Sequence, residues 1–260
     1  MARLRFRGLQ VPELQNVRLR KHNGMLKGRN RWFFLFFSIL IALIATYFVA
    51  LPDVSDLKKK NPSKTAFMKY REEEWKAKKE RRKIDQIWVP LTNVSPYLTN
   101  AVLIAEDDKF WQHEGFDFES IEKAIEKDIK AGKFRFGGST ISQQLARNLY
   151  LSPTKSIWRK FVEAILTWKL ERTLSKKRIL ELYLNLVEWG EGIFGAEAAS
   201  RHYFGKHSID LSPMEAARLA VILPNPRRRD PTGSQRYIVE RSQLIYEIMV
   251  KRGLLDPDSF

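Results

Sequence analysis

The sequence predicts an all-α domain that follows one N-terminal transmembrane helix. A run of 20 residues without a charge, 32–51, precedes the domain, and apolar residues recur at helical spacing from residue 91 onward. No segment shows the sustained alternation of apolar and polar residues that indicates a strand. The 260-residue chain has no cysteine, which excludes disulfides, thiol catalysis and zinc sites built on cysteine.

The apolar run "WFFLFFSILIALIATYFVAL" is long enough, at about 30 Å as a helix, to cross the core of a bilayer. Trp32 and Tyr47 lie towards its ends, where amphipathic rings favour the membrane interface. A buried soluble helix and a cleaved signal peptide are the alternatives. The run is long for a signal peptide, and Phe48 is bulky where a cleavage site requires a small residue. We therefore expect an uncleaved membrane anchor.

The basic excess of the chain lies on both sides of this run. The formal net charge is +16, of which residues 1–31 contribute 9 basic and 1 acidic side chain, or +8. Residues 52–90 hold 12 basic and 7 acidic side chains, or +5, and this leaves +3 for residues 91–260. This placement favours an anionic membrane over nucleic acid as the partner. The positive-inside rule does not decide the orientation, because the 20 residues on each side hold six Lys or Arg apiece.

Residues 52–90 are interpreted as a charged stalk. "LKKKNPSK" is polar and interrupted by proline, and "REEEWKAKKERRK" is typical of a solvated helix. Glu72 with Lys76, and Glu74 with Lys78, have the spacing of ion pairs on one helix face.

From residue 91 to residue 260 we expect one predominantly helical domain. The first helix is predicted at "SPYLTNAVLIAED", with Ser95 as its N-cap and Pro96 at its first position. The second, "DFESIEKAIEKDIKAG", has isoleucines four apart and stops at Gly132. The third, "STISQQLARNLYLSP", begins behind two glycines and ends at Pro153.

Four more helices are predicted in the rest of the domain. "WRKFVEAILTWKLERTL" and "SKKRILELYLNLVEW" each carry one apolar face, and the second includes Tyr183 on that face. "SPMEAARLAVIL" opens with a capping box between Ser212 and Glu215. "SQRYIVERSQLIYEIMVKRG" ends at Gly253.

Three polar clusters are candidates for chemistry. The first is "EDDKFWQHEGFD", residues 106–117, which follows the apolar stretch "AVLIA". Glu106 is expected where core meets solvent, and partial burial would raise its pKa towards the range useful for proton transfer. Taken alone, the cluster fits a solvated loop as well as a catalytic centre. His113 alone is more typical of a structural histidine, and there is no HExxH spacing for a metal.

The second and third clusters combine polar and basic residues. In "GGSTISQQLARN", residues 137–148, two glycines precede a helix start that could bind an anion, or could simply be a turn and a cap. In "KSIWRKFVEAI", Arg159 and Lys160 lie one helical turn before Glu163. This arrangement is either a surface ion pair or a carboxylate flanked by cations that could receive a polyanionic leaving group.

Together the segments resemble the family-51 peptidoglycan glycosyltransferases, in their monofunctional branch. Five motif regions occur in order over about 106–206: "EDDKFWQHEGFD", "GGSTISQQLARN", "RKFVEAILTWKLE", "KKRILELYLNLVEWG" and "GIFGAEAASRHYFGK". The resemblance implies a lysozyme-like fold of two lobes that polymerises lipid II into glycan strands and releases undecaprenyl diphosphate. It also implies a cytoplasmic N-terminal tail, with the catalytic domain on the outer face of the cytoplasmic membrane. The implied partners are lipid II, the growing glycan chain and other cell-wall synthesis proteins.

The same resemblance assigns roles to residues. Glu106 is implied as the general base and Glu163 as the residue that organises the diphosphate side, and Asp107 is implied to help hold a divalent cation, Mg or Mn. The implied substrate-binding residues are Ser139, Gln143, Gln144, Arg147, Lys155, Arg159 and Lys160. Arg147 stands where the family usually has lysine, and Lys155 where many members have arginine. "KAGKFRFGG" falls in the family's membrane-facing segment, where Phe134 and Phe136 are expected to approach the interface or to form a plain amphipathic loop.

Two other functions fit some of these observations. A lysozyme-like enzyme that cleaves glycans could also use one glutamate in a helical cleft, as an acid. A non-enzymatic membrane scaffold could use the basic flanks, although the nearly neutral charge of 91–260 argues against it.

Overall fold

The computed structural model describes residues 31–255 except 43, 45, 49, 133–137 and 155. The chain divides into two compact units, Met1–Pro52 and Asp53–Phe260. In the first unit, Arg31–Phe48 is a helix long and apolar enough to cross a membrane, and it is the one such helix in the described part of the chain. The large apolar side chains described between Trp32 and Ile44 are exposed, as the predicted anchor requires. Residues 1–30 of the predicted basic tail lie outside the described residues.

Nearly all of the regular secondary structure in the second unit is helical, so the predicted fold class is confirmed. Its α-helices are α2 (Ala66–Ala77), α3 (Pro96–Glu106), α4 (Phe118–Ala131), α5 (Ile141–Tyr150), α6 (Ile157–Thr173), α7 (Lys176–Leu186), α8 (Ala196–Phe204), α9 (Pro213–Ile222) and α10 (Arg236–Lys251). The described residues of this unit also form three short 3-10 helices, η1 (Ser55–Lys58), η2 (Leu91–Asn93) and η3 (Ser208–Asp210). The predicted caps are present: Ser95 accepts from the Tyr97 amide, and Ser212 and Glu215 form a capping box.

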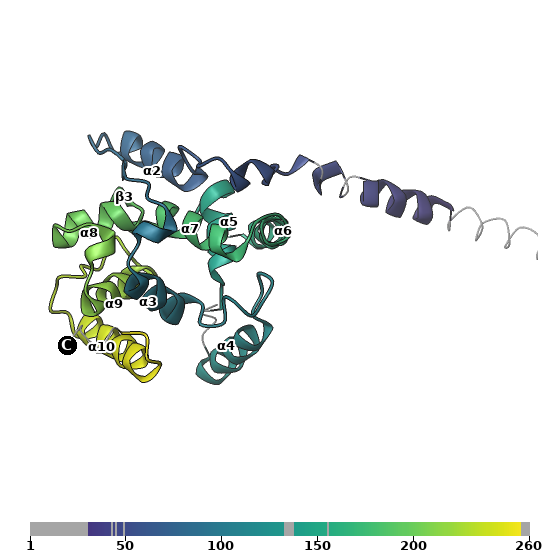
Figure 1. Ribbon diagram of the computed structural model, residues 1–260. Helices are drawn as coiled ribbons and strands as arrows, with labels where there is room; N and C mark the ends of the chain where they lie inside the picture. The colour runs from purple at the N-terminus through teal and green to yellow at the C-terminus, as the bar shows by residue number, and fades with distance from the viewer. Residues whose placement is uncertain are drawn as a thin grey trace, which may run out of the picture. The chain divides into compact units, whose positions relative to one another are not determined.

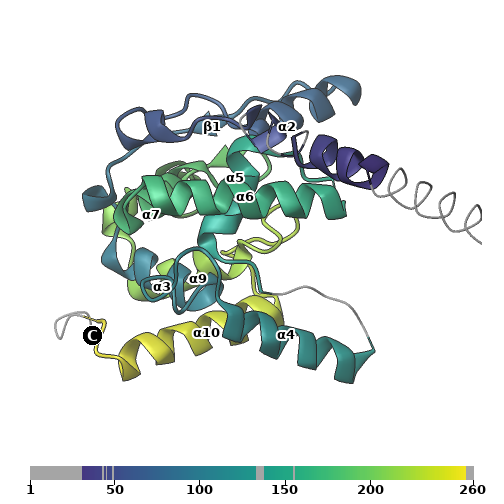
Figure 2. The same ribbon diagram turned by 90° about the vertical axis from the view of Figure 1, so that its right-hand side faces the viewer.

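The helices pack in two groups. Helices α3, α9 and α10 contact one another, whereas α5 contacts α2, α6 and α7. In both Figure 1 and Figure 2, helices α5, α6 and α7 lie above α3, and α10 lies below it. The largest fully buried side chains are Trp75, Trp189, Tyr183, Phe110 and Phe194. The C-terminal end of α3 therefore lies where residues from both groups can approach it.

The structure also contains a small sheet that the period of the sequence does not reveal. Strand β3 (Ile193–Phe194) pairs in parallel with β1 (Asp85–Gln86) and antiparallel with β2 (Glu188–Gly190). Strands of two or three residues are too short to show an alternating pattern. The parallel pairing joins residues more than 100 positions apart and fastens the segment before residue 91 to the domain.

The segment 52–90 differs from the solvated stalk expected of it. Helix α2 packs against α5, and Met68 and Trp75, seven residues apart, are buried on one face. The Arg71 guanidinium donates to both carboxylate oxygens of Glu188, at 2.8–3.2 Å. Two apolar residues among many charges carry too weak a periodic signal to predict this packing. The compact unit accordingly begins at Asp53 rather than at residue 91.

The predicted ion pairs on α2 are present in part. Lys78 donates to Glu74 at 2.7 Å, as its spacing predicts. Glu72 instead pairs with Lys64, which lies before the helix, at 2.7 Å.

Two ion-paired carboxylates predict how stability depends on pH. Hydrogen bonding from Lys78 and then Arg71 lowers the pKa of Glu74 to about 2. Burial alone would raise the pKa of Glu197, but hydrogen bonds from Ser208, Arg201 and His207 lower it to about 2. Because both pKa values are below the ordinary 4.5, their contribution is present above pH 4.5 and is lost as the pH falls towards 2.

We expect the thermal unfolding midpoint of the full chain in detergent to stay level from pH 7 to about pH 5 and to fall steadily below that. Circular dichroism at 222 nm measures it, and Glu197→Gln should flatten part of the fall. An unchanged midpoint between pH 5 and pH 2.5 would contradict the assignment.

Candidate active site

Glu106 is the last residue of α3, and its carboxylate is half-buried. Burial raises its pKa above the ordinary value of 4.5, and the hydrogen bond from Gln144 and the charge of Arg147 offset this in part. The charge of Asp107 raises the pKa further, and that of Arg241 on α10 lowers it. A carboxyl group with a raised pKa that still faces cations can accept a proton near neutral pH.

The side chain of Gln144 on α5 holds this carboxylate. Its Nε2 donates to Glu106 Oε2 at 2.7 Å, and its Oε1 accepts from the Tyr183 hydroxyl at 3.0 Å. Nε2 also lies 3.4 Å from the backbone oxygen of Ser139. Asn148, one helical turn further along α5, donates from Nδ2 to the Gln144 backbone oxygen at 2.8 Å.

Asp107 joins the loop after α3 to the start of α5 through two hydrogen bonds. Its Oδ2 accepts from the backbone amide of Ile141, the first residue of α5, at 2.9 Å. Its Oδ1 lies 2.9 Å from His113 Nε2. His113 Nδ1 accepts from the Gly115 amide at 3.0 Å, so the ring proton is on Nε2 and is donated to Asp107. The loop after α3 is thereby fastened to the start of α5, which places Gln144 beside Glu106.

This use of Asp107 does not fit the predicted role in holding Mg or Mn. Both carboxylate oxygens already accept hydrogen bonds, and the residue is 6% exposed. Across the described part of the chain, no group of three or more His, Cys, Asp or Glu side chains could hold a metal ion. We therefore assign no step of the reaction to a metal bound at Asp107.

We expect Asp107→Asn to lower thermal stability. Its NH₂ group cannot accept a hydrogen bond, so either the Ile141 amide or His113 Nε2 would lose its acceptor. Hydrogen bonds to a charged group contribute about 1.5–3 kcal/mol each. The unfolding midpoint of the full chain should fall by several degrees, and by the same amount in magnesium chloride and in EDTA. A magnesium-dependent rise in the wild-type midpoint that Asp107→Asn abolishes would instead identify a metal ligand.

Glu163 forms a second cluster with two cations. Its side chain is fully buried, and it accepts from Arg159 Nη1 at 2.9 Å and from Lys160 Nζ at 2.5 Å. Lys160 Nζ also donates to the Ser139 hydroxyl at 3.1 Å. The buried Nε of Arg159 has no hydrogen-bond partner within the described residues. The interpretation as a simple surface ion pair is therefore wrong, because the cluster is a fully buried carboxylate flanked by two cations.

Ser139 connects the two clusters. Its backbone oxygen faces the Gln144 amide beside Glu106, while its hydroxyl accepts from Lys160 beside Glu163. Ser139, just before the start of α5, therefore lies between the two glutamate clusters.

Two of the other predicted site residues lie differently, and a third is outside the described residues. Gln143 is 4% exposed, and its Oε1 accepts from the Thr140 amide at 3.0 Å, so it caps α5 and does not join the two clusters. The positive charge of Arg147 lowers the pKa of Glu106, but the Arg147 side chain forms no hydrogen bond within the described residues. Lys155, like Phe134 and Phe136 of the predicted membrane-facing segment, lies outside the described residues.

Two residues near Glu106 were missed by sequence reasoning. Tyr183 lies on the apolar face of α7, and it is a core residue as that pattern predicts. The pattern does not reveal that its hydroxyl also donates to Gln144. Arg241 lies 135 positions after Glu106 and belongs to no cluster in the sequence. Only the tertiary fold brings its charge near enough to lower the pKa of Glu106.

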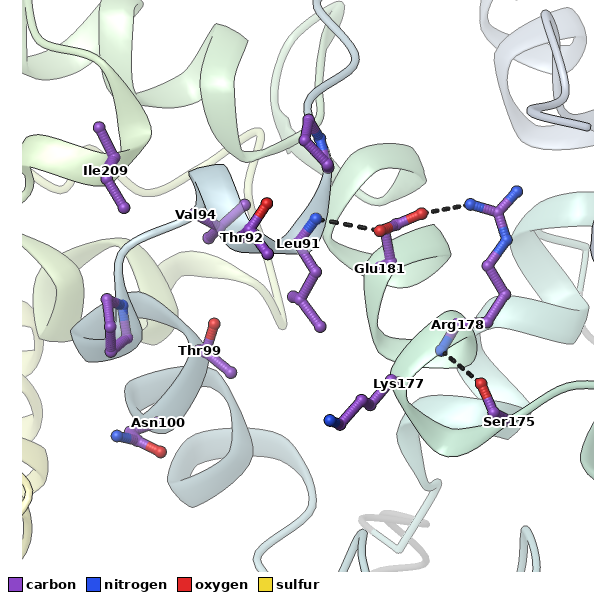
Figure 3. Close-up of a pocket in the computed structure, with 12 residues that line it drawn as sticks. Leu91, Thr92, Val94, Thr99, Asn100, Ser175, Lys177, Arg178, Glu181 and Ile209 are labelled. Carbon is purple, nitrogen blue, oxygen red and sulfur yellow. Dashed lines mark hydrogen bonds and ion pairs between the residues drawn. The ribbon is translucent and has the colours of Figure 1, made fainter. Parts of the chain in front are cut away.

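A groove of about 640 Å³ elsewhere on the domain contains none of these residues. It lies among η2, the start of α3 and the start of α7 (Figure 3). Its one carboxylate, Glu181, accepts from the Leu91 amide at 3.0 Å and pairs with Arg178. Because that carboxylate is engaged in holding η2 against α7, the candidate site is the one at Glu106.

The domain matches a family of known proteins over most of its length. A family model described as Transglycosylase matches residues 73–250 and so includes both glutamate clusters. A "Biosynthetic peptidoglycan transglycosylase" of Nitrosospira multiformis is 45% identical over 225 residues, which cover 86% of this chain and 98% of that protein.

Two further relatives carry the same name. One from Dechloromonas aromatica is 51% identical over 71% of this chain and 80% of its own length, and one from Azoarcus is 54% identical over 65% and 73%. The family predicted from the five motifs and the enzyme class that it implies are confirmed. The chain belongs to the transglycosylase family.

Proposed function

We propose that this protein is a membrane-anchored peptidoglycan transglycosylase that polymerises lipid II into glycan strands and releases undecaprenyl diphosphate. The observation that carries the proposal is the pair of linked clusters: a glutamate with a raised pKa at Glu106, and cations around Glu163, joined through Ser139. The names of the relatives supply the substrate class.

In the proposed reaction, the 4-hydroxyl oxygen of the acceptor sugar attacks C1 of the donor sugar. Its proton passes to the Glu106 carboxylate, and the C1–oxygen bond to the diphosphate breaks. The leaving diphosphate takes the bonding electrons, and the positive charges of Arg159 and Lys160 stabilise it. One inverting displacement converts an α-linked donor into a β-linked product, so no protein nucleophile is required.

The anchor fits this substrate. Lipid II is membrane-embedded, so an enzyme held by the apolar helix Arg31–Phe48 would meet it at the bilayer surface. We infer that the N-terminal tail is cytoplasmic and the catalytic unit lies on the outer face. Labelling of single cysteines introduced at residue 10 and at residue 255 with a membrane-impermeant maleimide on intact spheroplasts tests this inference, and only residue 255 should react.

Purified full-length protein in detergent, given radiolabelled lipid II, tests the reaction. We expect polymer that lysozyme digests. The competing glycan-cleaving function predicts release of soluble fragments from finished peptidoglycan and no polymer from lipid II, and that result would overturn the proposal.

A further inference from the structure

The hydroxyl of Tyr183 lies at the inner end of a chain of hydrogen bonds that ends on Glu106. It donates to Gln144 Oε1 at 3.0 Å, and Gln144 Nε2 donates to Glu106 Oε2 at 2.7 Å. Tyr183 is 1% exposed, so its hydroxyl has no access to solvent or to a substrate. We propose that Tyr183 is a positioning residue for the transglycosylase reaction, which fixes the Gln144 amide so that its NH₂ group faces the Glu106 carboxylate.

The direction of the Gln144 amide matters because its two ends are opposite in character. With NH₂ towards Glu106, the amide stabilises the ionised carboxylate that must accept the proton. Turned by 180°, it would place a carbonyl oxygen against that carboxylate, and the two acceptors would repel each other. The hydroxyl of Tyr183 favours the first arrangement by donating to the carbonyl end.

Tyr183 is suited to this role because it keeps its proton. Burial, followed by the charge of Glu106, raises the pKa of Tyr183 well above 10. The phenol is therefore a permanent donor and not an acid or base, and the intervening amide carries no proton between Tyr183 and Glu106. The remaining charged groups that act on Glu106 come from other elements: Asp107 next to it, Arg147 on α5 and Arg241 on α10.

The role rests on the proposed function, in which Glu106 is the base, and it predicts how turnover responds to Tyr183→Phe. The substitution removes one hydroxyl and retains the buried ring. We expect kcat on lipid II to fall roughly three- to tenfold, the range of one lost neutral hydrogen bond. KM should be unchanged, because Tyr183 contacts no substrate.

A double-mutant cycle separates positioning from packing. Gln144→Met keeps the length of the side chain and removes the amide, so it should lower kcat at least as much as Tyr183→Phe. Adding Tyr183→Phe to Gln144→Met should then change kcat by less than about twofold, because no amide remains to be oriented. An equal loss in both backgrounds, an unchanged kcat in the single variant, or an effect confined to KM would each overturn the inference.

Tyr203→Phe is the matched control. The Tyr203 hydroxyl also donates one hydrogen bond within the domain, to the backbone oxygen of Trp189 at 3.2 Å, but it does not contact Gln144. This variant should shift the unfolding midpoint as Tyr183→Phe does and leave kcat at the wild-type value. If the wild type itself makes no polymer from lipid II, the proposed function fails; if it does and the cycle shows no coupling, only the role of Tyr183 fails.

Discussion

Glu106→Gln is expected to reduce turnover on lipid II by about 10²- to 10⁴-fold, the usual contribution of a general base. The glutamine is isosteric and can still accept the hydrogen bond from Gln144 Nε2, so the shape of the site and the binding of substrate should be retained. Only the ability to accept a proton is lost. Polymer formation at saturating lipid II, measured by gel electrophoresis of labelled strands, gives the change in kcat.

The unfolding midpoint of Glu106→Gln should not fall, although its turnover does. Because the pKa of Glu106 is raised on folding, its ionised form is less favourable in the folded than in the unfolded chain near neutral pH. Removing the charge should therefore leave the unfolding midpoint unchanged or raise it. A variant that is both inactive and less stable would indicate a damaged fold instead of a missing base.

Asp108→Asn is the control for Glu106→Gln. Asp108 lies two positions away, is about half exposed and pairs with Arg252 on the surface. The hydrogen bond from Arg252 lowers the pKa of Asp108, so Asp108 is a weaker base than Glu106, whose pKa is raised. Turnover of Asp108→Asn close to wild type, beside a large loss in Glu106→Gln, would restrict the effect to one carboxylate.

The helices of the domain could be predicted because their signals are local. Ser95 and Ser212 cap helices in the structure as they do in the sequence pattern, since a cap depends on residues within one turn. The packing of α2 could not be predicted, because Arg71 finds Glu188 only after the chain between them has folded.

The site was predictable only in part, for the same reason. Gln143 and Gln144 are adjacent and both polar, and nothing in the sequence separates them. The structure does, because Thr140 uses Gln143 to cap the helix and leaves Gln144 to reach Glu106. Asp107 likewise fits a metal ligand by residue type, and only its two hydrogen bonds to separate segments show that it anchors α5.

Glu163→Gln and Glu188→Gln should separate turnover from stability, because both change a buried glutamate that is paired with an arginine. Glu163 is fully buried against Arg159 and Lys160, and the side chain of Glu188 is 4% exposed against Arg71. Breaking a buried ion pair from one side costs about 3–5 kcal/mol when the remaining charge has no other partner. Arg71 keeps Glu74 at 2.8 Å, so Glu188→Gln should cost less stability than that.

Turnover should fall far more in Glu163→Gln than in Glu188→Gln, because only Glu163 lies at the proposed donor site. Without Glu163, the cations of Arg159 and Lys160 are no longer held in place, and loss of a preorganised charge arrangement of this kind lowers kcat on the order of a hundredfold. Glu188 holds α2 against β2 and contacts neither Arg159 nor Lys160. Its glutamine variant should therefore retain kcat within about twofold, because the change lies away from the reacting groups. Rates must be measured below both unfolding midpoints and normalised to folded protein. Equal losses of kcat in the two variants would mean that Glu163 acts through the stability of the fold and has no separate part in the departure of the diphosphate.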